Sequence, residues 1–191
     1  MPDIAGAGKK LRQALFFLGH LEQASKDTRG DRRDPEHLEF YFSACLSAAK
    51  SIYYVLDKTG DATFREVQKR WRGELPEPQR SWFGRMMGLR DNDVHVASSG
   101  AEPLPKYVKE EDWSRSAHYT YFSSSAALFG SAPDVEMENP DGTKVSGPVL
   151  RGALGLYLKQ QGRLIEATEA CREFIRQMES LLEEMKTACG R

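Results

Sequence analysis

Apolar residues recur at three- and four-residue steps along most of the chain, a spacing that places them on one face of an α-helix. The first such segment runs from about Lys9 to Lys26. The second begins at the Asp34-Pro35 pair, where the aspartate suits the N-cap and the proline suits the first helical position. It ends at Gly60, and its wide apolar stripe predicts a central member of a helical bundle.

Two further helices are predicted in the middle of the chain. The segment TFREVQKRWRG has Thr63 and Glu66 at the spacing of a capping box, which predicts a short helix that begins there. The next helix is expected to start near Pro78 and to include SWFGRMMGLRDNDVHV. Its expected core side consists of Trp82, Phe83, Met86 and Met87.

The pattern changes after Ser98. The segment SSGAEPLPKY is typical of a loop, HYTYF alternates as a strand does, and VEMENPDGTKV carries the Pro-Asp-Gly signal of a hairpin turn. Helical spacing returns from about Arg163 to Lys186. We therefore predict a mainly α fold: one domain over residues 1–191, an antiparallel helical bundle with a small β-hairpin-containing insertion, residues 105–160, before the last helix.

Composition places this domain among soluble globular proteins. Apolar residues make up 40% of the chain and charged residues 29%, with a formal net charge of -1, so any nucleic-acid contact must use local patches. Cys45, Cys171 and Cys189 lack the spacing of a disulfide framework or a zinc site. No signal peptide and no run of about 18 apolar residues is apparent, so we expect a cytoplasmic protein without a membrane span.

One segment carries candidate chemistry. GLRDNDVHV, residues 88–96, places Arg90 and His95 five positions apart near the end of a predicted helix. Arg32 and His37 have the same spacing, but they flank Pro35, where the chain is expected to turn. The first pair is therefore the better candidate.

The helical positions around this pair support a site. Asp91 precedes His95 by one turn, so its carboxylate is expected to orient the imidazole and favour its protonated form. Arg90 offers a charged fork that suits phosphate oxygens. Gly84 and Gly88 continue the same stripe, and each glycine costs a helix about 1 kcal/mol relative to alanine. We therefore expect another helix, a second subunit or a phosphate backbone to approach this face.

The helix FYFSACLSAAKSIYYVL, a Trp-containing segment and a helix that ends in LRDNDVHV together resemble the HEPN superfamily. The signature of that superfamily is an arginine, a polar residue, a few further residues and a histidine, and Arg90, Asp91 and His95 match these positions. The resemblance covers roughly residues 10–98, and the final helix would complete the bundle.

The resemblance implies a homodimer in which two motifs meet across the interface and act as a metal-independent endoribonuclease, so neither a metal nor a cofactor is expected. It also implies RNA as substrate. The chain is most similar to stand-alone bacterial members, some of them toxins or defence proteins paired with a nucleotidyltransferase-like antitoxin.

Different interpretations of the same residues remain open. The chain is alternatively a non-catalytic HEPN-like module that binds RNA or protein, or a nucleotide-binding accessory protein. A basic cluster is either an RNA-guiding surface or an ordinary solvated face, and the aromatic residues Tyr119, Tyr121 and Phe122 either stack bases or pack a hairpin. The cluster consists of Arg65, Lys69, Arg70, Arg72, Arg80 and Arg85, offset by Glu66, Glu74 and Glu77.

Overall fold

The computed structural model describes residues 2–26, 35–58, 61–96, 101–109, 135–147, 150–160 and 162–190. Within these ranges the side chains of residues 90–96, 135 and 150–152 are not described. The described part is mainly helical with a small antiparallel sheet, as the sequence pattern predicts. None of its helices combines the length and the apolar character needed to cross a membrane.

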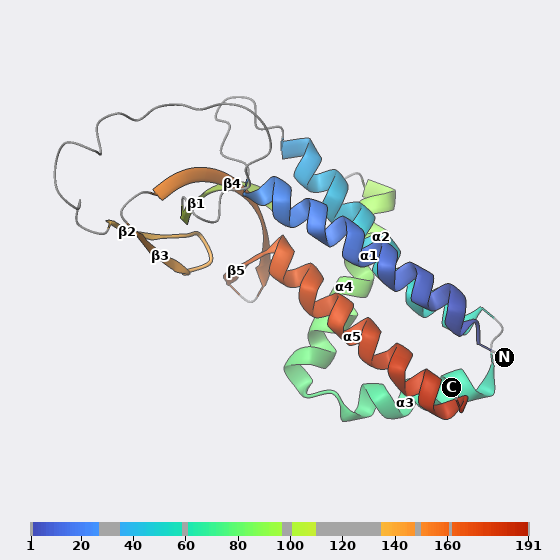
Figure 1. Cartoon of the computed structure of the whole chain (residues 1–191). Coiled ribbons are helices and arrows are strands. Elements are labelled where there is room, and N and C mark those ends of the chain that lie inside the picture. Colours follow the sequence, from blue (N-terminus) through green and yellow to red (C-terminus); the bar gives the residue numbers. More distant parts are fainter. Residues whose placement is uncertain are drawn as a thin grey trace.

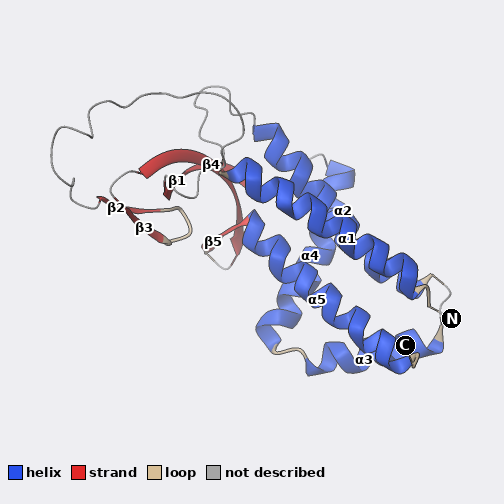
Figure 2. Ribbon diagram, in the orientation of Figure 1, coloured by secondary structure: helices blue, strands red, loops and turns tan. Residues whose placement is uncertain are grey.

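The helices form an elongated bundle (Figure 1). Helices α1 and α2 run antiparallel, and α5 lies against both, while α3 and α4 pack on α5 and α2. The amino and carboxyl ends lie at one end of the bundle, and the strands gather at the other end (Figure 2). The helices are α1 (Ile4–Ser25), α2 (Pro35–Asp57), α3 (Ala62–Glu74), α4 (Glu77–Val96) and α5 (Ala167–Ala188).

Helix α2 occupies the centre of the core, as its wide apolar stripe predicts. Phe42, Leu46 and Ile52 are almost fully buried among side chains of α1 and α5. Small residues such as Ala49 allow the neighbouring helix backbones to approach closely. The predicted N-cap Asp34 and the predicted end at Gly60 lie outside the described residues.

The start of α3 differs from the prediction. Thr63 lies inside the helix, and Asp61 is the N-cap, since its carboxylate accepts a hydrogen bond of 2.8 Å from the Thr63 backbone amide. That bond holds the pKa of the Asp61 carboxyl below its usual range. The capping-box spacing of Thr63 and Glu66 was misleading because an aspartate two residues earlier reaches the same orphan amides.

A loop is predicted over residues 98–107, and strand β1 (Ala101–Lys109) overturns that prediction from Ala101 onward. It pairs with β4 (Leu150–Gln160), which pairs in turn with β5 (Arg163–Glu166), so β1 is an edge of a three-stranded antiparallel sheet. Pro103 and Pro105 are tolerated because a proline at an edge needs no partner for the amide that it lacks. Tyr107 lies two residues after Pro105, so its backbone amide points to the same side of the strand as the two proline nitrogens. That amide donates a hydrogen bond to the Asn139 side chain at 2.7 Å.

The predicted hairpin is confirmed. Strands β2 (Val135–Glu138) and β3 (Lys144–Gly147) pair antiparallel across a Pro140-Asp141-Gly142 turn. Gly142 has φ +84°, a conformation that a residue without a side chain adopts readily. The predicted strand HYTYF lies outside the described residues.

The last helix begins later than predicted, at Ala167, because Arg163–Glu166 form β5. The alternation of β5 covers only four residues, so helical and strand periodicity cannot be separated there from sequence alone. From Ala167 onward the prediction is confirmed, and the face of α5 that includes Phe174, Met178 and Leu181 is buried.

Candidate functional site

The Arg90–His95 motif lies in the last two turns of α4. Helical geometry places Asp91 and His95 one turn apart on α4, and Arg90 about 7.5 Å from His95 along the axis. The side chains of all three residues lie outside the described set, so their mutual contacts stay predictions. What the structure describes is the helix that positions them and the surroundings of its preceding turns.

Aromatic packing fixes the first half of α4. The side chains of Trp82, Phe83 and Met86 are buried, as their spacing predicts. The Phe83 ring meets the Trp71 ring edge-on, with 5.2 Å between centroids, and lies 5.9 Å from the Phe174 ring. The part of α4 that precedes the motif is therefore held in place by its packing on α3 and α5.

A tyrosine of α2 joins the same aromatic cluster. The Tyr53 ring lies 5.2 Å from Phe64 and 6.5 Å from Phe83, between centroids. Burial raises the pKa of the Tyr53 hydroxyl, and Asp57 adds to that rise while Arg72 opposes it. Tyr53 consequently stays neutral through the physiological range and acts here as a packing residue.

The glycine face of α4 is open. A methyl group placed on Gly84 or Gly88 would meet no atom within 4 Å, and both residues are exposed. The expectation that another helix of the chain approaches this face is therefore not met among the described residues. Within the described part of the chain nothing covers this face, and the sequence pattern also allows a second subunit or a phosphate backbone there.

A buried lysine on α2 contacts α4 just before the motif. The Lys50 side chain is only 2% exposed, and its Nζ donates a hydrogen bond of 2.7 Å to the Met87 carbonyl oxygen. Sequence reasoning did not select Lys50. The signal was present, since Lys50 follows Leu46 by one turn inside an otherwise apolar stripe.

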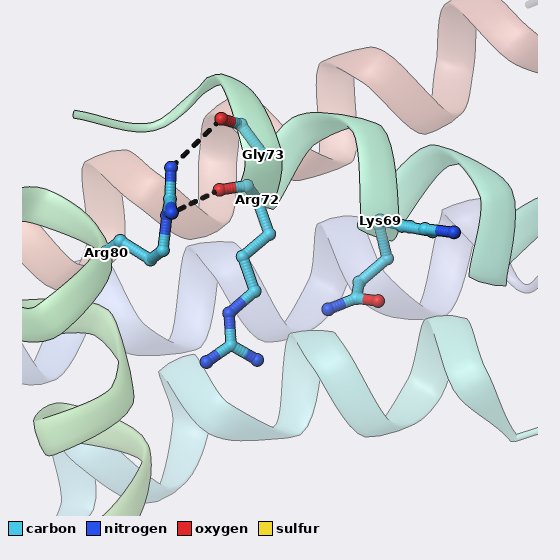
Figure 3. A pocket seen from close by; sticks show the side chains of 5 residues that line it. Lys69, Arg72, Gly73 and Arg80 are labelled. Atoms are coloured by element: carbon cyan, nitrogen blue, oxygen red, sulfur yellow. Dashed lines mark hydrogen bonds between the residues drawn. The ribbon is translucent and has the colours of Figure 1, made fainter. Parts of the chain in front are cut away.

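Three of the six residues of the basic cluster form structural contacts through their guanidinium groups. The Arg80 guanidinium donates to the carbonyl oxygens of Arg72 and Gly73 at 3.1 and 3.0 Å (Figure 3). It also donates to the Leu75 carbonyl oxygen at 2.9 Å, closing the turn between α3 and α4. Arg70 pairs with Glu184 at 2.7 Å. Arg85 donates to the Lys159 carbonyl oxygen of β4.

Two cations of that cluster lie over a shallow depression of about 370 Å³, whose lining also includes Gln68, Gly73 and Arg80. Lys69 and Arg72 are exposed, and their side chains extend away from Arg80 (Figure 3). Neither forms an ion pair within the described part of the chain. Arg65 is exposed as well, and the Arg72 guanidinium lies 6.0 Å from the centroid of the Phe83 ring. These three cations are the members of the cluster that suit an RNA phosphate.

The two other histidines within the described ranges, His20 and His37, do not lie together in a second site. His20 stacks on Tyr41 with 5.2 Å between ring centroids and meets Phe16 edge-on at 4.4 Å. His37 is exposed on α2, and its predicted companion Arg32 lies outside the described residues. His118 and the aromatics Tyr119, Tyr121 and Phe122 also lie outside them.

A buried polar cluster lies in the sheet, away from α4. The Lys106 Nζ is 2.5 Å from a Glu166 carboxylate oxygen, with side-chain exposures of 7% and 19%. The neighbouring Tyr157 hydroxyl is buried without a hydrogen-bond partner among the described residues. Burial, reinforced by Glu166, raises the pKa of Tyr157 above its usual range.

No cluster of three or more His, Cys, Asp or Glu side chains suited to a metal occurs within the described ranges. No family model, curated protein or solved structure matches this chain. Membership of the HEPN superfamily therefore stays a prediction from the motif and the order of the helices.

Proposed function

We propose that this chain is a metal-independent endoribonuclease of the HEPN type, acting as a homodimer in a toxin or defence role. The observation that carries the proposal is the position of Arg90–His95 on α4: the motif continues a helix face that is open at Gly84 and Gly88. Glycine has no side chain, so a phosphodiester substrate can approach the backbone of this face next to an arginine and a histidine.

In the proposed reaction RNA supplies its own nucleophile. His95 accepts the proton of the 2′-hydroxyl, and the 2′-oxygen bonds to phosphorus. The bond from phosphorus to the 5′-oxygen breaks as the protonated His95 returns a proton to that oxygen, which restores the neutral imidazole. Arg90 stabilises the charge on the phosphoryl oxygens, and Asp91 orients the His95 ring. The products are a 2′,3′-cyclic phosphate and a 5′-hydroxyl.

The proposed partners follow from the same face. A second copy of the chain would bring a second motif to the open side of α4, and a nucleotidyltransferase-like antitoxin is the proposed protein partner in the bacterial context. Lys69 and Arg72 would guide the RNA backbone, since both are exposed cations on α3, near the beginning of α4.

One observation favours a non-catalytic module for protein or RNA instead. Phe16, Phe40 and Tyr54 expose 60%, 63% and 51% of their surfaces on α1 and α2. Exposed aromatic side chains are typical of interaction surfaces. In such a module, Arg90 and Asp91 stabilise an interface and no hydrolysis occurs.

The test is cleavage of structured and single-stranded RNA by the purified protein in excess EDTA, with the end groups of the products identified. His95→Ala is the variant, and His37→Ala is the matched control because Arg32 and His37 share the motif's spacing. We expect cleavage by the wild type and by His37→Ala, and a loss of at least about 100-fold in His95→Ala, the usual contribution of general acid–base catalysis.

Three different results would reject the proposal. Equal cleavage by wild type and His95→Ala would indicate a different site, and products with a 3′-hydroxyl would exclude attack by the 2′-oxygen. Binding of RNA without cleavage would favour the non-catalytic module.

A further inference from the structure

Lys50 is an unusual residue for the interior of α2. Lysine is almost never fully buried unless its nitrogen is paired, yet Lys50 is 2% exposed between the helices. Its Nζ donates to the Met87 carbonyl oxygen at 2.7 Å and lies 5.5 Å from the centroid of the Tyr54 ring. The stem of the side chain thus crosses from α2 to the backbone of α4.

The Met87 carbonyl lies just before the motif on α4. In an α-helix each carbonyl accepts a hydrogen bond from the amide four residues later, so the Met87 oxygen lies beside the backbone amide of Asp91. Met87 precedes Arg90 by three residues and His95 by eight. Met86 is the last fully buried side chain described on α4, so the Lys50 contact is the polar tie between α2 and the start of the motif.

Burial decides between two roles for this lysine. A side chain that is 2% exposed does not meet a phosphate in solvent, so Lys50 acts on the site through α4. Burying an ammonium group costs several kcal/mol, and a methionine of similar volume would avoid that cost. The hydrogen bond to the Met87 carbonyl oxygen and the Tyr54 ring face near the Lys50 Nζ offset part of that cost.

We propose that Lys50 is a positioning residue of the Arg90–His95 motif, which holds the last two turns of α4 against α2 through the Met87 carbonyl. Its consequence for catalysis rests on the ribonuclease function proposed above. The structural part, an ordering of residues 91–96 by Lys50, holds independently of that function.

The first test measures order rather than activity. Amide hydrogen exchange of peptides that cover residues 91–96 is compared in wild type, Lys50→Met and Lys50→Arg, with Lys58→Met as the exposed-lysine control. We expect about tenfold faster exchange in Lys50→Met, because one charge-assisted hydrogen bond is lost. Exchange in Lys50→Arg and Lys58→Met should stay close to the wild type, and unfolding in urea should show that Lys50→Met is still globally folded.

The second test uses cleavage kinetics in EDTA. Lys50→Met should lower kcat about tenfold with the KM for RNA unchanged, and Lys50→Arg should restore most of the rate. A role in core packing alone would lower the amount of folded protein and leave kcat per folded molecule unchanged. If Lys50→Met does not fold, Lys50→Gln, which keeps a donor without the charge, is measured in the same way.

The outcomes separate the two proposals. No cleavage by wild type together with faster exchange in Lys50→Met would reject the ribonuclease and retain the positioning role. Unchanged exchange of residues 91–96 in a folded Lys50→Met would overturn the positioning role, whether or not RNA is cleaved.

Discussion

Gly155 lies at the point where two larger side chains of the sheet meet. A methyl group at this position would be 2.7 Å from the Tyr157 ring and 3.1 Å from the Lys106 stem. Both neighbours are buried, and Lys106 is held by Glu166. At the residue scale the sequence predicts apolar burial well, as Trp82 illustrates. It does not predict buried lysines such as Lys106, because their partners lie far away along the chain.

Gly155→Ala is expected to destabilise the fold by about 1–3 kcal/mol, since overpacking forces buried side chains off their preferred rotamers. Urea unfolding measures the change. Gly19→Ala is the control, because Gly19 lies in exposed helix with nothing within 4 Å, and it should stabilise by about 0.5–1 kcal/mol. Equal effects of the two substitutions would show that the Tyr157 ring can move aside.

At the scale of the elements, the helices were predictable and strand β1 was not. A 3.6-residue period is visible over twenty residues of α2 or α5, whereas two prolines in Ala101–Lys109 argue against a strand. Only the pairing with β4 shows that β1 is an edge, and that pairing joins segments about fifty residues apart. The helical pattern of the sequence also placed the motif on α4. The contact from Lys50 could not be predicted, because it depends on how α2 packs against α4.

The turn between α3 and α4 depends on Arg80. We expect Arg80→Ala to destabilise the protein by about 1 kcal/mol, because a half-exposed guanidinium no longer satisfies the carbonyl oxygens at the end of α3. Arg80→Lys keeps the charge but not the planar fork, so its free energy of unfolding should lie between those of wild type and alanine. An Arg80→Lys variant as stable as wild type would assign the effect to charge alone.

At the scale of the whole molecule, three helices meet at a pair of cysteines. The Cys45 thiol of α2 lies 3.7 Å from the Ala14 carbonyl oxygen of α1, and it neighbours the buried Cys171 thiol of α5. Burial, then the contact with Cys45, raises the pKa of the Cys171 thiol well above its usual value of 9.0. Because the folded-state pKa is raised, this contribution to stability is complete below pH 9.0 and is lost as pH rises beyond it.

Thiol labelling should therefore report on the global fold. In native protein at pH 8 we expect fast reaction of Cys189 alone, which is partly exposed, and reaction of Cys45 and Cys171 at the rate of unfolding. Cys189→Ser supplies the control, and it should show no fast phase. Fast labelling of two or more thiols in folded protein would contradict the packing of α1, α2 and α5.

Helix α5 lies against α1, α2 and α3, and the ribosome makes all three of those helices before it. The apolar faces of the nascent helices consequently lack their packing partner until α5 emerges, and such exposed surfaces are prone to aggregation. The same order of synthesis delays any chemistry on α4. The described end of α4 would therefore gain its full packing support only after α5 has been made.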